Sequence, residues 1–241
     1  MSFLTRVIVL FFGMNVFFAD PCFALTRFSE QAQFYSQAAQ DKFVWLLLYG
    51  FLNKQDKGHY LEIGAHHPIE INNTYFFEKN LGWEGVSIDI SDDHKNLWQM
   101  TRRNTLLIED ATKSDYRTML KSFPKEIDYL SIDIDRHYDL VLQRIPFDEH
   151  IFKVITIEHD FYGFGDEFRQ KERSILAPLG YYLLCPDVSN QGNIYEDWWI
   201  HPSAFPEDVL AKLLSLDLKT KEHGPLIKII QEHMHSNGIS Y

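Results

Sequence analysis

Acidic residues follow five successive apolar runs of this chain, and their spacing indicates a shared chemical task. These residues are Glu62 in YLEIGAHHP, Asp89 in SIDIS, Asp110 in LIEDAT, Asp133 in LSIDIDRH and Glu158 in ITIEHD. Each run is short enough for a buried strand, and the carboxyl ends of parallel strands meet at one edge of a sheet. One such acid is often only a helix cap. Five on one rim would repel one another without a ligand rich in hydroxyls, amines or positive charge.

The loop after the first run, GAHHP, contains one glycine, Gly64. A pyrophosphate needs the repeated glycines of G-x-G-x-x-G, so a nicotinamide-dependent oxidoreductase is a weak alternative. The loop suits a ligand without phosphate: a nucleoside with an amino-acid tail and a sulfonium charge, which is S-adenosylmethionine. Asp89 is placed to accept hydrogen bonds from ribose hydroxyls, and Asp110 to accept one from the amino group of adenine. We expect His67 to bond backbone groups of a tight turn, with Pro68 starting the next helix.

Short apolar runs alternate with helix-compatible segments after Gln31, which predicts an α/β fold with parallel strands and helices on both faces of the sheet. The last run is aromatic and is expected to be an antiparallel strand. The predicted strands are His59–Ile63, Gly85–Asp89, Thr105–Ile108, Ile127–Asp133, Lys153–Glu158, Gly180–Leu184 and Ile194–Ile200.

Helical periodicity before and after these strands predicts one or two opening helices within Ala32–Leu52 and further helices at Pro206–Leu216 and Leu226–Met234. The expected organisation is therefore a domain over residues 30–205 and a C-terminal helical extension over residues 206–241.

The N-terminus carries an apolar run, Val7–Phe18, after Arg6 and before small residues near Cys22–Ala24. This pattern is typical of a signal peptide over residues 1–24, with a membrane anchor through residues 3–25 as the alternative. Either predicts export or membrane association, whereas the cytosolic supply of S-adenosylmethionine favours the cytoplasm.

The overall charge bounds the partners of the protein. The 241 residues carry a formal charge of −11, with 34 acidic and 23 basic side chains, which argues against sequence-blind nucleic-acid binding. The two cysteines, Cys22 and Cys185, give neither a disulfide framework nor a zinc spacing, and Cys185 is expected to be a buried apolar residue.

Several phrases resemble the FkbM-type family of S-adenosylmethionine-dependent methyltransferases over about Tyr35–Pro202. They occur in the family's order: the S-Q-x-x-Q-D pattern from Ser36 to Asp41, EIGAHHP, the Asn73-Thr74-Tyr75 turn, FFEKNLGWEGVSID, IDYLSIDID, FKVITIEHD and EDWWIHP. The resemblance implies a Rossmann-like class I methyltransferase fold with a mostly parallel seven-stranded sheet.

The same resemblance implies roles for individual residues. Asp133 matches the fourth-strand acid beside the transferred methyl group, and Asn73 and Thr74 match the turn that opens the next helix. The candidate cofactor-binding residues are Glu62, Gly64, Ala65, His66, Asn73, Thr74, Asp89 and Asp110.

One departure from the family pattern follows the fourth strand. Relatives commonly have glycine after the acidic pair, whereas this chain has Asp135-Arg136-His137. The bulky cation narrows the acceptor pocket or marks a loss of activity, so a binding protein that retains the fold is the alternative function.

Methyl transfer to a hydroxyl requires a group that accepts the proton of the acceptor, and Asp133, His137 and His159 are the candidate bases. A divalent metal such as Mg²⁺ is the alternative, with oxygen ligands from Asp133, Asp135, Glu158 and Asp160. A metal hydrolase on the same residues is a weaker reading. His159 has a second interpretation, in which it orients Glu158. The aromatic residues Tyr195, Trp198 and Trp199 are expected to be core rather than a sugar-stacking platform.

These observations together predict an S-adenosylmethionine-dependent methyltransferase. The expected reaction is O-methylation of a sugar, a glycan or another small-molecule hydroxyl.

Overall fold

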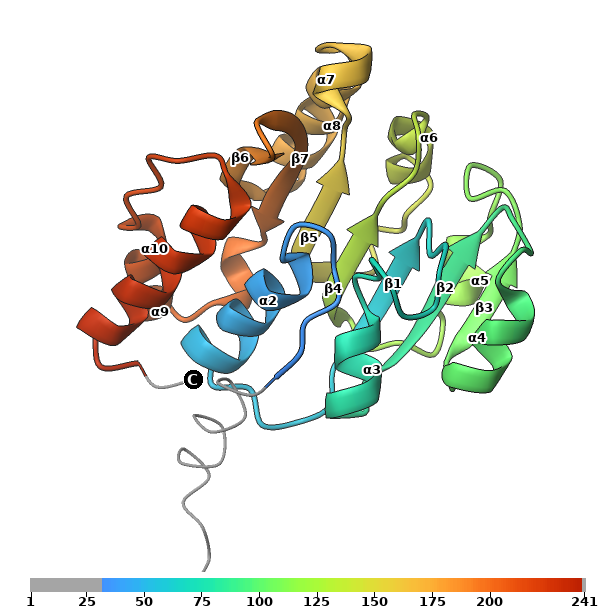
Figure 1. The fold of residues 1–241 in the computed structure, drawn as a ribbon, viewed down its shortest axis with the longest axis horizontal. Helices are drawn as coiled ribbons and strands as arrows, with labels where there is room; N and C mark the ends of the chain where they lie inside the picture. The colour runs from blue at the N-terminus through green and yellow to red at the C-terminus, as the bar shows by residue number, and fades with distance from the viewer. Residues whose placement is uncertain (1–31, 240–241) are drawn as a thin grey trace, which may run out of the picture.

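The computed structural model describes residues 32–239, which form a seven-stranded sheet between two layers of helices (Figure 1). The strands are β1 His59–Ile63, β2 Glu84–Asp89, β3 Thr105–Ile108, β4 Glu126–Ile132, β5 Ile151–Glu158, β6 Tyr182–Asn190 and β7 Asn193–Ile200. Their order is β3-β2-β1-β4-β5-β7-β6, and β7 runs antiparallel to both of its neighbours. This arrangement confirms the predicted class I methyltransferase fold.

Apolar side chains on each face of the sheet pack against a different set of helices. One cluster joins α2 (Gln40–Trp45), the π-helix η1 (Leu46–Phe51), α3 (Tyr75–Leu81), α9 (Glu207–Leu214) and α10 (His223–Ser236). The other joins α5 (Tyr116–Met119), α6 (Tyr138–Leu142) and α8 (Glu167–Leu176). The remaining helices are α4 (Lys95–Thr101), α7 (Phe161–Phe164), and the 3₁₀ turns η2 (Ala177–Leu179) and η3 (Pro202–Ala204).

Four aromatic and sulfur residues of β6 and β7 are buried, as predicted, with Cys185 and Trp198 in the first cluster and Trp199 in the second. Tyr195, Trp198 and Trp199 are at most 4% exposed, and Cys185 is fully buried. They contribute apolar burial to the sheet and are not available as a platform for a ligand.

The sixth strand was predicted too short. β6 continues to Asn190, although Pro186 follows the predicted end at Leu184. Its pairing with β7 shifts register between Cys185 and Val188, and β6 is the edge strand of the sheet, with only an isolated bridge from Ser189 to Glu222 on its outer side among the described residues. An edge strand tolerates a proline because its outward N–H group needs no partner.

The helix after β1 begins later than predicted. Residues 67–72 form bends and turns, and α3 begins at Tyr75 rather than at Pro68. Asn72 Oδ1 accepts hydrogen bonds from the backbone N–H groups of Thr74 (3.0 Å) and Tyr75 (2.7 Å), which holds the start of the helix. The Asn73-Thr74-Tyr75 turn therefore opens the helix, as the resemblance implied.

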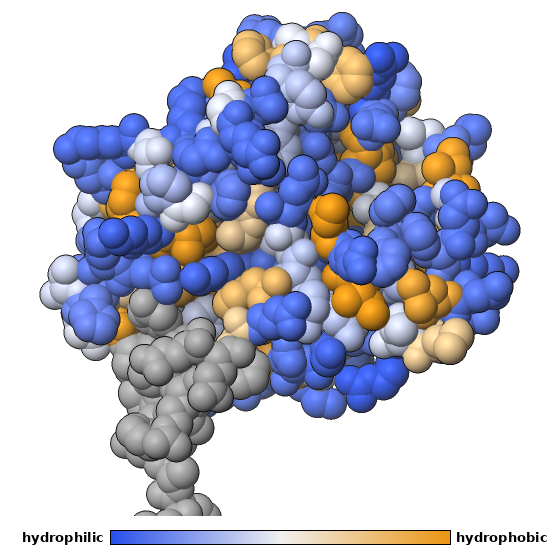
Figure 2. All heavy atoms as spheres, viewed as in Figure 1, coloured by the Kyte–Doolittle hydropathy of each residue, from blue (hydrophilic) through white to orange (hydrophobic). Residues whose placement is uncertain are grey.

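The proposed signal peptide or anchor, residues 1–24 or 3–25, lies outside the described residues. Within residues 32–239, no helix has both the length and the apolar character that a membrane span requires. The face shown in Figure 2 is mostly hydrophilic, with apolar side chains in separate groups, which agrees with the high content of charged residues.

Candidate functional site

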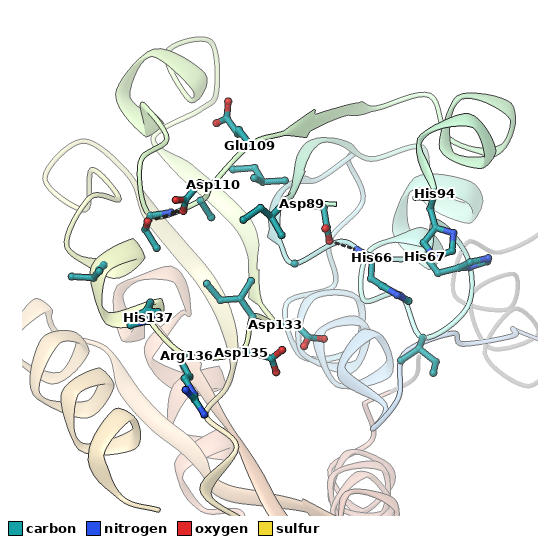
Figure 3. A pocket seen from close by; sticks show the side chains of 18 of the residues that line it. His66, His67, Asp89, His94, Glu109, Asp110, Asp133, Asp135, Arg136 and His137 are labelled. Carbon is teal, nitrogen blue, oxygen red and sulfur yellow. Dashed lines mark hydrogen bonds between the residues drawn. The ribbon is translucent and has the colours of Figure 1, made fainter. Parts of the chain in front are cut away.

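A cavity of about 1140 Å³ opens at the carboxyl ends of β1 to β4, the edge at which the acidic rim was predicted (Figure 3). Three predicted acids, Asp89, Asp110 and Asp133, line it together with Gly64 and His66. Strands β3, β2, β1 and β4 are neighbours in the sheet, so residues far apart in the chain, such as Gly64 and Asp133, meet here. The remaining lining residues are Gln37, His67, Glu70, Ile71, Ile88, Ile90, His94, Glu109, Ala111, Thr112, Lys113, Ile134, Asp135, Arg136, His137 and Leu140.

Gly64 allows the loops after β1 and β4 to touch. Its φ is 88°, and a Cβ at this position would lie 1.7 Å from the backbone oxygen of Asp133. A side chain here would therefore push the β4 loop away. This close backbone contact is the first reason for a glycine at position 64. Gly64 also borders the cavity.

Asp89 is held in a fixed orientation at the end of β2. Its Oδ2 accepts the backbone N–H of His66 at 2.6 Å, and its Oδ1 accepts that of Ser91 at 2.8 Å. Each carboxylate oxygen has two lone pairs, so both retain the capacity to accept a hydroxyl proton from a ligand.

Asp110, at the end of β3, is already partnered. Thr112 donates its backbone N–H and hydroxyl to Oδ1, and Lys113 donates to Oδ2 at 2.8 Å. The hydrogen bond from Lys113 lowers the pKa of Asp110 to about 2, so the carboxylate is ionised at neutral pH. Its predicted contact with adenine would have to coexist with these bonds.

Asp133 joins the cavity to a row of acids at the end of β5. Glu158 lies within hydrogen-bonding reach of both Asp133 and Asp160. Burial, followed by the contact with Asp133, raises the pKa of Glu158 to about 12, and burial also raises the pKa of Asp133. The row therefore holds a proton at neutral pH.

Glu62, Asn73 and Thr74 lie behind the cavity wall rather than on it. Ser87 donates to Glu62 Oε2 at 2.6 Å, and burial raises the pKa of Glu62. Asn73 donates to Ser131 at 3.0 Å and to Asp133 at 3.4 Å, so it supports the Asp133 carboxylate. Ala65 is also buried and is not part of the lining.

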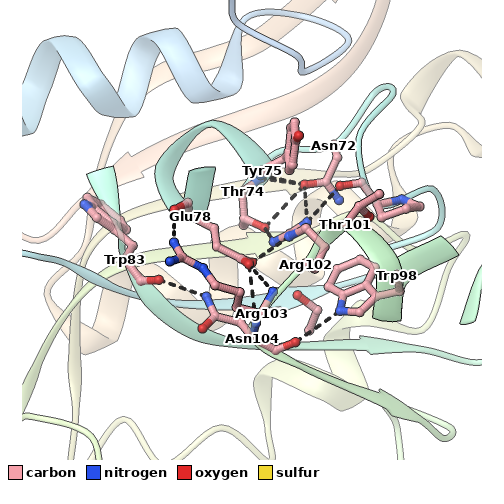
Figure 4. A network of polar contacts seen from close by, with 12 residues as sticks. Asn72, Thr74, Tyr75, Glu78, Trp83, Trp98, Thr101, Arg102, Arg103 and Asn104 are labelled. Atoms are coloured by element: carbon pink, nitrogen blue, oxygen red, sulfur yellow. Dashed lines mark hydrogen bonds and ion pairs between the residues drawn. The ribbon is translucent and has the colours of Figure 1, made fainter. Parts of the chain in front are cut away.

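Arg102 ties this wall together (Figure 4). Its guanidinium donates five hydrogen bonds, to Glu78, the Pro68 carbonyl, Asn72, Tyr60 and Thr74, at 2.6 to 3.1 Å. Glu78 also accepts the backbone N–H of Arg103. The network fixes the turn before α3 relative to β1 and the end of α4.

Three histidines gather at the opposite side of the cavity. The rings of His66 and His67 each lie edge-to-face with that of His94, at 4.8 and 4.9 Å between centroids. His67 Nδ1 accepts the backbone N–H groups of Ile69 (3.3 Å) and Glu70 (2.8 Å), which confirms the predicted turn contact.

Arg136 and His137 form a strained lip of the cavity. Both have left-handed φ values, 67° and 56°, a conformation that glycine adopts most readily. The Arg136 guanidinium lies 4.2 Å above the Phe164 ring of α7, an attractive cation–π geometry. Strain of this kind persists only where the surrounding structure imposes it.

His159 lies away from the cavity. It is 1% exposed, its Nδ1 accepts the backbone N–H of Phe161, and its Nε2 lies 3.5 Å from Asp197 Oδ1. Its predicted role as a base has no support from this position, and its second interpretation, that it orients Glu158, stays a prediction.

The predicted metal ligands do not converge. Among the described residues, one group of acids and histidines has ligand atoms within 4.8 Å of one another, and it consists of His159, Asp187 and Asp197. Arg173 already bonds both of these aspartates, at 2.7 and 2.8 Å. The four carboxylates predicted to bind Mg²⁺ are not such a group, so their arrangement gives that prediction no support.

Sequence reasoning missed several lining residues. Glu109 directly precedes Asp110 and Lys113 follows it by three residues, and this closeness in the chain was an available signal. Gln37 belongs to the S-Q-x-x-Q-D pattern, whose Asp41 accepts the backbone N–H groups of Tyr35 (2.6 Å) and Ser36 (3.2 Å) before α2. His94 had no local signal, because only the tertiary fold brings it to His66.

No known protein family matches this sequence, and no curated protein matches it at a significant level. Solved structures do match. The cofactor-bound protein Rv0187 from MTB is 18% identical over 78% of this chain and 92% of that chain, with a TM-score of 0.50. The N-methyltransferase NodS from Bradyrhizobium japonicum WM9 is 13% identical over 68% and 94% of the two chains, with a TM-score of 0.41. Fibrillarin from Aeropyrum pernix, with natively bound S-adenosyl-L-methionine, is 14% identical over 68% and 74%, with a TM-score of 0.43.

Identities this low indicate a shared fold and nothing finer. The match to Rv0187 shows a shared fold over most of both chains. The resemblance to the FkbM-type family is carried by the sequence phrases alone.

Proposed function

We propose that this protein is an S-adenosylmethionine-dependent methyltransferase that methylates a hydroxyl of a sugar, a glycan or another small molecule. One observation carries the proposal. The class I methyltransferase sheet places Asp89, Asp110 and Asp133 at the carboxyl ends of three strands around a single large cavity. Ligands of open α/β sheets bind at this edge.

The chemistry of the cavity fits the cofactor. Asp89 would hold the ribose hydroxyls, Ile88, Ile90 and Ala111 offer apolar surface to a base, and Asp133 provides negative charge for a sulfonium. The same acids would repel a pyrophosphate, and the loop after β1 lacks the run of glycines that binds one. S-adenosylmethionine, when bound, would supply an electrophilic methyl group.

Two of the candidate bases line the cavity. Asp133 and His137 can each accept the proton that a hydroxyl acceptor must lose, whereas His159 is enclosed by protein. Burial raises the pKa of Asp133, which makes its carboxylate a better proton acceptor than a solvated aspartate. The finer FkbM-type assignment is supported by the matching phrases, among them the Asn73-Thr74-Tyr75 turn.

A binding protein that keeps the fold is the second candidate. The left-handed Arg136 and His137 at the lip favour it, because a side chain is held there at a cost in strain. This candidate predicts cofactor binding without methyl transfer.

Calorimetric titration of the purified protein with S-adenosylmethionine, its demethylated product and NAD⁺ tests the proposal. We expect the first two to bind at micromolar concentrations and NAD⁺ not to bind. Absence of binding by both sulfur compounds to folded protein would remove the proposed function.

A further inference from the structure

The row Asp133, Glu158 and Asp160 contains a buried carboxylate oxygen without a partner. Asp160 is 6% exposed, and its Oδ1 has no hydrogen-bond partner within the described structure. Buried polar atoms are nearly always partnered, so an orphaned carboxylate oxygen points to a missing donor.

No protein cation neutralises this row. Among residues 32–239, neither the three carboxylates nor the adjacent Asp135 forms an ion pair, and the nearby Arg136 is stacked on Phe164. The contrast with the half-buried Asp187 and the buried Asp197 is direct, because those acids are bonded by Arg169, Arg173 or Lys221. Asp187 and Asp197 are therefore paired with cations, whereas the acids of the row are not.

An exposed aromatic residue of α7, Tyr162, borders this row of acids. Tyr162 lies within hydrogen-bonding reach of Asp160 and is 61% exposed, and no residue of α7 is buried. Glu158 is half-buried, so a ligand from solvent can reach the row beside Tyr162. Carboxylates next to aromatic faces form a suitable environment for an organic cation.

We propose that Glu158 and Asp160, continued by Asp133, bind an ammonium group of the methyl acceptor, which makes the acceptor an amine-bearing molecule such as an amino alcohol or an amino sugar. As an assignment of the acceptor, this inference rests on the proposed methyltransferase function. Asp133 lines the large cavity while Glu158 and Asp160 lie beyond it. An acceptor whose ammonium group binds Glu158 and Asp160 would therefore present a neighbouring hydroxyl to the cavity.

A compact metal ion fits this row less well. Glu158 approaches each of the other two acids, but the ligand atoms of all three are not together within 4.8 Å of one another, as a metal site requires. An ammonium group makes up to three separate hydrogen bonds and suits acids in a row.

The inference is tested by calorimetric titration without cofactor, using three pairs of probes: glucosamine and glucose, tyramine and 4-ethylphenol, ethanolamine and ethylene glycol. We expect at least one amine to bind about tenfold more tightly than its neutral partner. Repeating the titration in two buffers of different ionisation enthalpy should reveal proton release, because the ammonium replaces the proton held by Glu158.

Glu158→Gln and Asp160→Asn should remove the preference for the amine. Glu167→Gln, which neutralises an exposed acid of α8 outside the row, should retain it. Thermal unfolding verifies that each variant is folded. If Glu158→Gln does not fold, Asp160→Asn alone tests the inference. Equal binding of amine and neutral probe in all three pairs, an unchanged preference in both variants, or competition by MgCl₂ at equal concentration would overturn the inference.

The two proposals fail separately. Loss of S-adenosylmethionine binding with an intact amine preference would contradict the methyltransferase assignment alone. Normal cofactor binding without an amine preference would contradict the ammonium site alone.

Discussion

Asp89 shows how a single side chain can be prepared for a ligand before the ligand arrives. Backbone N–H groups of His66 and Ser91 bond one oxygen each, at 2.6 and 2.8 Å. The carboxylate is therefore oriented without being saturated. Pre-oriented acceptors lose little freedom on binding, which favours affinity.

Replacing Asp89 with alanine should weaken S-adenosylmethionine binding by about 10- to 100-fold, because hydrogen bonds to a charged group contribute about 1.5–3 kcal/mol. Asp92→Ala, an exposed acid three residues later, is the matched control and should bind normally. Calorimetric titration measures both variants. Unchanged affinity in Asp89→Ala would show that the ribose does not lie at this residue.

Glu158 should make the stability of the protein depend on pH. Its folded pKa of about 12 lies above the ordinary 4.5, so the folded state keeps a proton that the unfolded state releases between these pH values. Stability therefore falls as the pH rises from about 4.5. Glu158→Gln should raise Tm by about 2–4 °C at pH 8 and by less near pH 5. Thermal unfolding at pH 5, 6.5 and 8 measures this, and parallel curves for the two proteins would contradict it.

At the scale of elements, the Arg102 network holds the wall of the site. Five hydrogen bonds from one guanidinium connect β1, the turn before α3 and the end of α4. Its charge is compensated by Glu78, and both side chains are buried. Removing one partner of a buried pair leaves the other uncompensated.

Arg102→Met should therefore lower the free energy of unfolding by about 3–5 kcal/mol. The neighbouring Arg103→Met keeps the backbone N–H contact with Glu78 and should cost less than about 1 kcal/mol, because the Arg103 side chain is exposed. Urea denaturation distinguishes the two. Similar losses in both variants would place the stabilising contact elsewhere.

Local pattern predicted most elements well and failed where tertiary contacts decide. β1 and β3 have their predicted bounds, because each is a short, mostly apolar run that ends at a polar loop. The extent of β6 past Pro186 depends on its edge position, and the late start of α3 depends on Asn72. A short stretch of sequence shows neither the order of the strands in the sheet nor which side chain holds the start of a helix.

The candidate site was predicted to a similar degree. Asp89, Asp110 and Asp133 share one cavity because strand ends share one edge, a rule that needs only the order of residues. His159 also follows a strand, but its side chain turns toward Asp197 of β7. That direction depends on which strand becomes the neighbour of β5, and the sequence does not contain this information in local form.

At the scale of the whole molecule, two apolar clusters on opposite faces of the sheet stabilise the site jointly. The first includes Leu226, Ile227, Ile230 and Met234 of α10, so the C-terminal helix shares a core with α2 and η1. A ligand that binds at the edge of the sheet should therefore stabilise the molecule as a unit.

Saturation with S-adenosylmethionine at about 100 times its Kd should raise the free energy of unfolding by about 2.7 kcal/mol, because only the folded state binds. For a chain of 241 residues we expect a rise in Tm of several degrees, measured by scanning fluorimetry. NAD⁺ at the same concentration is the control. Equal shifts with both compounds would indicate non-specific binding.

The antiparallel strand β7 has a consequence for biosynthesis. It lies between β5 and β6 although it follows both in the chain, so neither of them gains that neighbour until residues 193–200 leave the ribosome. A nascent polypeptide that ends earlier exposes strand edges open to pairing with other chains. Chaperone demand should therefore be highest for translation products that stop just short of this segment.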